Sequence, residues 1–291
     1  MKDFEYSAAA TLDDAVRLLA ERGDRARVLT GGTDLIVQLR EGLREADLVV
    51  DVKKIPQLME MSYSPKSGLR LGAAVPCHRI YEHPEIAAVY PGLADAAKII
   101  GGWQIQSRAS IGGNLCNSSP AADSIPILIA YNATSRIAGP QGERSVPVAD
   151  FCVSPGRNVL ARGELLVSLD FPPAPAGSSG AYLRFIPRNE MDIAVVGVGS
   201  WIKLSQSGET IEDARIGLGA VAPTPLFAEE ASSWLRGKPA SDETFTQASE
   251  LAKRIAKPIN DKRGPAEYRT HLVGVLTKRT LAIAVNRAKT K

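Results

Sequence analysis

Two glycine-rich segments carry the polar groups of this chain that are best suited to binding an anionic ligand. The first runs from Leu29 to Asp34 and the second from Ser110 to Asp123, and each holds a Gly-Gly pair beside hydroxyl or amide side chains. Paired glycines let consecutive backbone amides converge on an anion and let the main chain approach a ligand closely. Two such segments in one chain predict a ligand with a long phosphate-bearing spine, such as a dinucleotide.

The first segment does not follow the common phosphate-binding patterns. Leu29-Thr30-Gly31-Gly32-Thr33-Asp34 lacks GxGxxG spacing, and no lysine follows its glycines as in a Walker motif. A Rossmann fold or P-loop is therefore not expected. A carboxylate at Asp34 would repel phosphate unless it pointed away, so we expect Asp34 to cap a helix or orient the loop. For this segment alone, the simpler interpretation as a tight turn stays open.

The second segment is richer in hydrogen-bonding groups. Asparagine and serine side chains follow Gly112-Gly113, and such neutral groups can donate to phosphate and ribose oxygens. Asp123 can accept a hydrogen bond from a ribose or adenine donor; alternatively, it caps a helix that starts near Ser124. We expect all fourteen residues from Ser110 to Asp123 to form a loop without regular structure, a length that favours a binding role.

No other pattern in the chain supports chemistry by side chains alone. The three histidines share no metal-ligand spacing, and no Ser/His/Asp arrangement can be assembled. The three cysteines have no CxxC spacing, which excludes a four-thiolate cluster within this chain and fits a reducing compartment. We therefore predict no catalytic residue and no metal site, and we expect a cofactor to supply the chemistry.

Composition and charge narrow the class of protein. The 291 residues suffice for one large domain or for two to three modest ones. The net charge is only +3 and the basic residues are scattered, so we expect no nucleic-acid partner, and we expect the basic runs 25–27 and 262–263 to be solvated surface. The N-terminus has no apolar signal region, and no apolar run reaches transmembrane length. These features predict a soluble, cytoplasmic protein.

The elements that must position the glycine-rich segments differ between the two halves of the chain. In the first half, periodicity and turn residues predict helices at 12–22, 35–39 and 86–100, the last broken at Pro91-Gly92, and strands at 26–29, 47–52, 69–73 and 165–171. A Pro- and Gly-rich linker follows at 172–180. Three long antiparallel strands are then expected at 181–188, 193–204 and 214–221, followed by helices at 228–236, 242–256 and 266–289.

Both glycine-rich segments resemble the FAD-pyrophosphate loops of the flavoprotein (medium) subunit of molybdenum hydroxylases, the family that includes carbon monoxide dehydrogenase and xanthine dehydrogenase. The similarity continues through Asp192-Ile193-Ala194 and through residues 217–225 and 261–269. It implies an α+β fold. A two-lobed FAD-binding region of the vanillyl-alcohol-oxidase (PCMH) type would span 1–176, with lobes at about 1–55 and 56–176. A C-terminal α+β domain with a three-stranded antiparallel sheet and helices would span 177–291.

The resemblance also implies which residues bind FAD. Backbone amides of Thr30–Asp34 and Ile111–Asn114 would hold the pyrophosphate, and Asp123 would hold the adenosine half. Asp192 and Ile193 would lie beside the isoalloxazine ring. The complete expected set is Leu29, Thr30, Gly31, Gly32, Thr33, Asp34, Ser110, Ile111, Gly112, Gly113, Asn114, Asp123, Leu166, Arg184, Asp192 and Ile193.

The function that the resemblance implies is electron transfer. Electrons would reach FAD from the [2Fe-2S] clusters of a small partner subunit, after oxidation of a substrate on a large molybdenum–pterin subunit, and would leave to NAD, oxygen or a quinone. The complex would be a dimer of heterotrimers. A stand-alone flavin oxidase or reductase of the same fold and a non-enzymatic adaptor that has lost its flavin are the alternatives. Gln106-Ser107 departs from the Arg-Asn pair that is frequent in the family.

Overall fold

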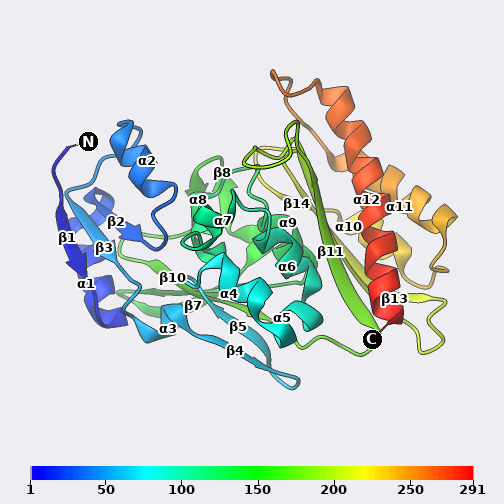
Figure 1. Cartoon of the computed structure of the whole chain (residues 1–291), viewed down its shortest axis with the longest axis horizontal. Helices are drawn as coiled ribbons and strands as arrows, with labels where there is room; N and C mark the ends of the chain where they lie inside the picture. The colour runs from blue at the N-terminus through cyan, green and yellow to red at the C-terminus, as the bar shows by residue number, and fades with distance from the viewer. Residues whose placement is uncertain (1, 291) are drawn as a thin grey trace.

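The computed structural model describes residues 2–290, and its three main β-sheets follow one another from one end of the molecule to the other (Figure 1). The sheets belong to a first lobe, a second lobe and a C-terminal domain. No helix among the described residues is both long and apolar enough to cross a membrane.

The first lobe is a three-stranded parallel sheet with the order β1-β3-β2. Helix α1 begins after Thr11, whose Oγ1 accepts a hydrogen bond from the Asp14 amide at 3.2 Å, and it ends at Gly23 with φ of 53°. Thr11 is therefore the N-cap of the helix, and a glycine with positive φ ends it. The elements are β1 (Glu5–Ala8), α1 (Leu12–Arg22), β2 (Ala26–Leu29), α2 (Leu35–Arg40) and β3 (Leu48–Asp51).

The second lobe has a five-stranded antiparallel sheet with the order β4-β5-β10-β6-β7. Buried side chains of this sheet and of helices α4 to α9 form the largest hydrophobic core. The elements are α3 (Pro56–Met59), β4 (Met61–Ser64), β5 (Gly68–Gly72), α4 (Cys77–Glu82), α5 (Pro84–Val89), α6 (Pro91–Ala97), α7 (Trp103–Gln106), α8 (Ile111–Asn117), α9 (Ile125–Ala130), β6 (Thr134–Gly139), β7 (Gly142–Pro147), β8 (Cys152–Ser154), β9 (Arg157–Asn158) and β10 (Leu165–Phe171).

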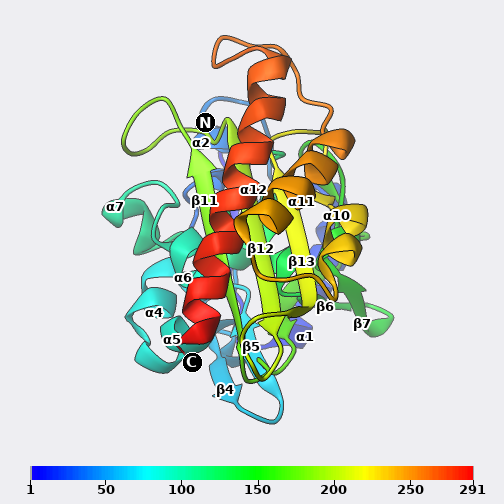
Figure 2. The same ribbon diagram turned by 90° about the vertical axis from the view of Figure 1, so that its right-hand side faces the viewer.

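The C-terminal domain is an antiparallel sheet, β11-β12-β13-β14, with helices α10 and α12 against one face and α11 packed against both helices (Figure 2). Helix α9 of the second lobe packs against the other face. Glycines in the strands allow this close approach, because a Cβ on Gly217 would lie 2.1 Å from the carbonyl O of Pro126. The elements are β11 (Ser178–Phe185), β12 (Val196–Leu204), β13 (Ile211–Gly219), β14 (Leu226–Phe227), α10 (Glu229–Leu235), α11 (Asp242–Ile255) and α12 (Ala266–Lys289).

Four sequence predictions need correction. The expected loop at 110–123 contains helix α8. The expected helix at 86–100 is broken at Pro91 as predicted, but its two parts, α5 and α6, begin at Pro84 and end at Ala97. Strand β11 begins at Ser178, inside the expected linker, because the first residues of the strand are buried and pair with the end of β12. The C-terminal sheet gains a fourth strand, the short β14, which pairs with the end of β13.

Candidate ligand-binding site

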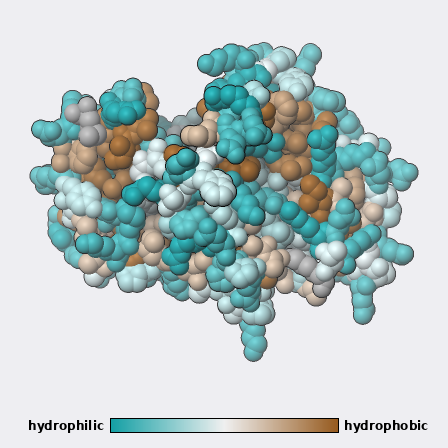
Figure 3. Space-filling view, in the orientation of Figure 1, coloured by the Kyte–Doolittle hydropathy of each residue, from teal (hydrophilic) through white to brown (hydrophobic). Residues whose placement is uncertain are grey.

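A cavity of about 620 Å³ lies between the two lobes and reaches the C-terminal domain. Its volume is within the range of small-molecule sites, and a hollow beside the first lobe is visible on the surface (Figure 3). Thirteen of the sixteen predicted residues line it; Leu29, Ile111 and Arg184 do not. The thirteen are Thr30, Gly31, Gly32, Thr33, Asp34, Ser110, Gly112, Gly113, Asn114, Asp123, Leu166, Asp192 and Ile193.

The glycines of the two segments bring the segments together. A Cβ on Gly31 would lie 2.1 Å from the carbonyl O of Arg108, and one on Gly112 would lie 2.5 Å from the carbonyl O of Ala73. No side chain fits at either position. Sequence reasoning assigned these glycines to close approach of a ligand; the structure shows that Gly31 and Gly112 serve close approach between backbone segments, while Gly32 supplies a positive φ of 75°.

Two hydroxyl groups complete the contact between the segments. Ser110 Oγ donates to Thr30 Oγ1 at 3.4 Å and accepts from the Gly113 amide at 3.0 Å, which makes Ser110 the N-cap of α8. A Cβ on Gly113 would meet these hydroxyl oxygens at 2.9 and 3.0 Å. The wall of the cavity is therefore one interlocked unit built from both segments.

The first segment presents backbone donors that have no partner within the protein. Among residues 2–290, the N–H groups of Gly31, Gly32 and Thr33 have no hydrogen-bond acceptor. Lys53 Nζ fixes the carbonyl O of Thr30 at 2.9 Å and also pairs with Asp51 at 2.8 Å. Consecutive unpaired backbone amides can form a cradle for an anion, so these residues fit the pyrophosphate of a dinucleotide.

Asp34 does not act as the predicted helix cap. It stands at the N-cap position of α2, but its side chain makes no capping hydrogen bond. It lines the cavity, and the surrounding protein raises the pKa of its carboxyl group by desolvation.

Asn114 and Asp123 are each held in place by hydrogen bonds with neighbouring side chains. Asn114 Oδ1 accepts from Ser124 Oγ at 2.6 Å, which leaves the Asn114 amide nitrogen available to a ligand. Asp123 accepts from the Tyr182 hydroxyl at 3.0 Å and from Arg184 Nη1 at 2.6 Å. Ser124, without help from Asp123, occupies the N-cap position of α9, so the helix-cap interpretation of Asp123 is wrong. Burial raises the pKa of Asp123 to about 6, and Arg184 and Tyr182 oppose that rise.

The C-terminal domain contributes Asp192 and Ile193 to the cavity. The Asp192 carboxylate accepts from the Ile193 amide at 2.8 Å and from Arg188 Nε at 3.3 Å, and these interactions lower the pKa of Asp192. Arg184 Nη1 lies 3.4 Å from the carbonyl O of Asp192. The structure thus places Arg184 behind Asp123 and Asp192, both of which line the cavity.

Sequence reasoning missed several lining residues, and three of them are arginines. Arg27, Arg44 and Arg162 line the end of the cavity that is formed by α1, β2 and residues 160–165. Arg27 belongs to a basic run that was expected to be solvated surface, and that expectation is wrong for Arg27 because it is partly buried in the cavity wall. Its position two residues before Leu29, in the strand that leads into the first segment, is the signal that could have identified it.

The structure shows what Gln106 does at the first position of the expected Arg-Asn pair. Gln106 is buried and does not line the cavity. Its Nε2 donates to the carbonyl O of Lys98 at 2.6 Å, and its Oε1 accepts from the Tyr81 hydroxyl at 2.9 Å. The side chain therefore anchors α7 to α4 and to the end of α6.

Other groups in and near the site are not arranged for metal or thiol chemistry. Among residues 2–290, no three His, Cys, Asp or Glu side chains gather closely enough to hold a metal ion. Cys116 lines the cavity, but burial raises the pKa of its thiol to about 12, so it carries almost no thiolate at neutral pH.

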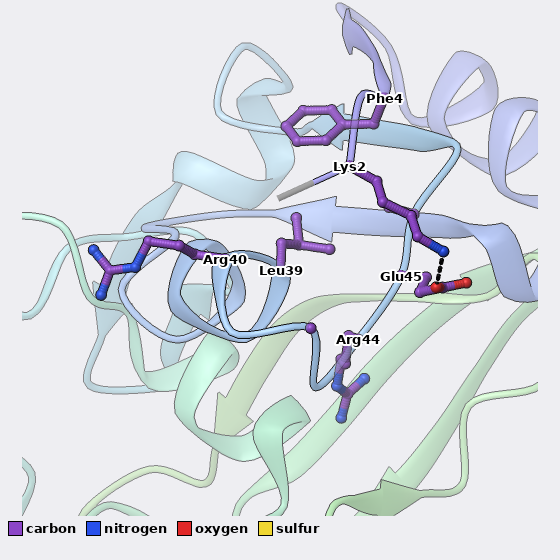
Figure 4. Close-up of a pocket in the computed structure, with 8 residues that line it drawn as sticks. Lys2, Phe4, Leu39, Arg40, Arg44 and Glu45 are labelled. Atoms are coloured by element: carbon purple, nitrogen blue, oxygen red, sulfur yellow. Dashed lines mark hydrogen bonds and ion pairs between the residues drawn. The ribbon is translucent and has the colours of Figure 1, made fainter.

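A second, smaller pocket lies on the outer side of the first lobe (Figure 4). It has a volume of about 210 Å³ and is lined by residues near α2, with an ion pair between Lys2 and Glu45 at its edge. None of the predicted site residues lines this pocket.

Both parts of the chain match families of known proteins. Residues 2–174 match the family described as FAD binding domain in molybdopterin dehydrogenase, and residues 181–284 match the CO dehydrogenase flavoprotein C-terminal domain. The chain is 33% identical to the xanthine dehydrogenase FAD-binding subunit of Escherichia coli O157:H7, over 98% of this chain and 97% of that protein. It is 32% identical to the carbon monoxide dehydrogenase medium chain of Hydrogenophaga pseudoflava, over 97% and 96% respectively.

The similarity extends to the three-dimensional structure. A chain of the reconstituted CO dehydrogenase from Oligotropha carboxidovorans superposes with a TM-score of 0.93 at 32% identity, over 98% of this chain and 99% of that one. The chain therefore belongs to the xanthine dehydrogenase and CO dehydrogenase flavoprotein family, and it is an oxidoreductase chain whose cofactor is FAD.

Proposed function

We propose that this chain is the electron-transfer subunit of a molybdenum-containing hydroxylase or dehydrogenase. Electrons would pass from [2Fe-2S] clusters of a partner subunit to FAD and on to an external acceptor such as NAD, oxygen or a quinone. The observation that carries the proposal is the interlocked pair of glycine segments, whose unpaired amides line a cavity that reaches the C-terminal domain.

The chain's own residues have the task of holding and orienting the cofactor. When bound, FAD supplies the group that accepts and releases electrons. The amides of Gly31–Thr33 would bind the pyrophosphate, and Asn114 would add a side-chain donor. Asp192 and Ile193 would border the ring from the C-terminal domain. No side chain in the cavity is required as a general acid or base toward the substrate of the whole enzyme.

The proposal includes the division of the chain. The FAD-binding region would span residues 1–176 as two lobes of the vanillyl-alcohol-oxidase type, and the C-terminal domain would span 177–291. Support comes from the segment between Phe171 and Ser178, which joins the last strand of the second-lobe sheet to the first strand of the C-terminal sheet.

The partners would be a large molybdenum–pterin subunit and a small [2Fe-2S] subunit, assembled as a dimer of heterotrimers. The relatives are named as a medium chain and as an FAD-binding subunit, and these names indicate that each belongs to a larger enzyme. This chain spans nearly the full length of both relatives.

The test is purification of the tagged full chain from its native cells. Two further subunits are expected to co-purify, together with FAD, iron and molybdenum in fixed ratio to the chain. Reduction of the isolated complex by its substrate should bleach the flavin. A chain that purifies alone and turns over a flavin substrate without partners would instead support the stand-alone oxidase or reductase.

A further inference from the structure

Residues 186–195 form the loop that carries Asp192 and Ile193 from the C-terminal sheet to the cavity. Contacts within the loop fix its shape, since the Asp192 carboxylate accepts from Arg188 Nε at 3.3 Å and Arg188 Nη2 donates to the carbonyl O of Met191 at 2.9 Å. Because these contacts join residues of the same loop, they do not fix where the loop stands relative to the sheet. That placement depends on the residues that hold the two ends of the loop.

Arg269, at the start of α12, holds the end at which the loop returns to the sheet. Its Nη1 donates to the carbonyl O of Val195 at 2.8 Å, and Val195 is fully buried. A buried carbonyl needs a donor, and a charged donor makes a stronger hydrogen bond than a neutral one. The start of α12 lies at the end of the sheet where the loop emerges (Figure 2). Arg269 therefore fixes the main chain two residues after Ile193.

The guanidinium of Arg269 is itself firmly held. It is buried, its Nη2 donates to Asp261 Oδ1 at 2.6 Å, and its Nε donates to the carbonyl O of Gly264 at 3.4 Å. Asp261 Oδ1 also accepts from the Arg263 amide at 2.8 Å, so the acceptor is tied to its own turn. A planar guanidinium whose three nitrogens all donate has a fixed orientation. The segment 261–269 thus has a role although none of its residues lines the cavity.

The residue before Arg269 contacts the other end of the loop. The Tyr268 ring packs edge-on against the ring of Phe185, the last residue of β11, with the ring centroids 5.8 Å apart. The Val195 amide donates to the carbonyl O of Phe185 at 2.9 Å, so the two ends of the loop are also joined to each other. Two consecutive residues of α12 therefore contact both ends of the loop.

We propose that Arg269 is a positioning residue for the cofactor site, which sets where Asp192 and Ile193 stand against the flavin ring of FAD. Arg184 Nη1 also lies 3.4 Å from the carbonyl O of Asp192, but the same nitrogen donates to Asp123 at 2.6 Å. The 2.8 Å contact made by Arg269 is the shorter of the two contacts to the loop backbone. This inference rests on the proposed function, because it requires FAD in the cavity with its ring beside the loop.

The experiment titrates the flavin-free full chain with FAD and with ADP by calorimetry, and records the visible circular dichroism of the bound flavin, which reports on the surroundings of the ring. ADP lacks the flavin ring, so its binding should not depend on the loop. Arg269→Met removes the donors and keeps an apolar side chain. We expect it to weaken FAD binding by about 10-fold and to change ADP binding by less than about threefold. The dichroism of the bound flavin should also change.

Arg287→Met is the matched control. Arg287 also lies on α12 and donates to a strand carbonyl, that of Gly180, at 2.9 Å, and to the carboxylate of Asp95 at 2.6 Å. It lies near the opposite end of the helix from Arg269. Arg287→Met should lower the melting temperature as Arg269→Met does, but it should leave the FAD affinity, the ADP affinity and the flavin dichroism unchanged. A purely structural role of Arg269 would make the two variants alike.

Unchanged FAD affinity and flavin dichroism in Arg269→Met would overturn the inference. Equal losses of FAD and ADP affinity would also overturn it, because general damage to the fold would then suffice, and so would an equal change of dichroism in Arg287→Met. If Arg269→Met does not fold, Asp261→Asn weakens the same anchor and keeps the guanidinium. Altered dichroism with unchanged ADP affinity in that variant supports the inference, and unaltered dichroism overturns it. Failure of the unmodified chain to bind FAD overturns the proposed function itself, and the inference with it.

Discussion

The guanidinium of Arg184 and the carboxylate of Asp123 form an ion pair of 2.6 Å across the boundary between the second lobe and the C-terminal domain. Their side chains are only 6% and 11% exposed. Tyr182, on the same strand as Arg184, donates to the other carboxylate oxygen at 3.0 Å. Since Asp123 lines the cavity and Arg184 contacts the carbonyl O of Asp192, this pair joins both domains at the cavity.

Arg184→Met is expected to destabilise the protein strongly. It leaves the buried Asp123 carboxylate without its cation, and breaking a buried pair in this way costs about 3–5 kcal/mol. Urea unfolding of the flavin-free chain measures the loss. The control is Arg17→Met, which removes an exposed ion pair with Glu21 and should cost less than about 1 kcal/mol. Equal losses of unfolding free energy in the two variants would contradict this expectation, because the buried pair would then stabilise the fold no more than an exposed one.

Gly31→Ala is expected to separate the two glycine segments. The new Cβ would lie 2.1 Å from the carbonyl O of Arg108, and the backbone would have to move. Overpacking of this kind costs about 1–3 kcal/mol or more, and the displaced amides should no longer bind FAD. Gly102→Ala is the control, because its Cβ meets nothing closer than 3.5 Å. The measurement is the ratio of flavin to protein absorbance after desalting. Retention of flavin by Gly31→Ala at the level of Gly102→Ala contradicts the interlocking role.

Ser110→Ala tests whether the N-cap of α8 also shapes the cofactor site. Loss of the cap should reduce stability by about 1 kcal/mol and also weaken FAD binding, because the Thr30 contact disappears. Ser241→Ala removes the N-cap of α11, far from the cavity, and should lower stability similarly without affecting FAD. Thermal melts and FAD titrations of both variants provide the comparison. The expectation fails if both variants bind FAD equally well.

The acid stability of the first lobe should depend on Asp51. Burial opposes its ionisation, but hydrogen bonds from Lys53 and Tyr6 together hold the pKa of Asp51 below its usual value. A lowered carboxyl pKa stabilises the fold above the unfolded value of about 4 and ceases to do so as the pH falls through the folded value. The stability difference between the unmodified chain and Asp51→Asn, measured in urea, should therefore be constant at neutral pH and shrink below about pH 4. A difference that grows as the solution becomes more acidic would rule this out.

The limits of a helix or strand could be predicted from the sequence where its local residue pattern agrees with its packing in the fold. The limits of β10 (Leu165–Phe171) and α12 (Ala266–Lys289) match the expectation from sequence. Helix α8 was missed because its two glycines lower intrinsic helix propensity by about 1 kcal/mol each relative to alanine. The Ser110 cap and the burial of Ile111 and Leu115 in the core offset that cost, and neither effect can be read from periodicity.

In the candidate site, too, features within one short segment could be predicted, whereas contacts between distant residues could not. The glycine segments were visible in the sequence because their residue types are unusual at that spacing. Asp123 and Arg184 are 61 residues apart, so no sequence spacing indicates that they meet. Arg27 is partly buried in the cavity wall near α1 and the segment 160–165, and the partial burial of a basic residue cannot be inferred from a short basic run.

The most direct test of FAD binding by this chain is an absorption spectrum of the purified full chain, recorded after incubation with FAD and removal of unbound flavin. We expect visible flavin bands that correspond to one FAD per chain. A chain that stays colourless, both alone and when isolated together with its co-purifying subunits, would contradict it.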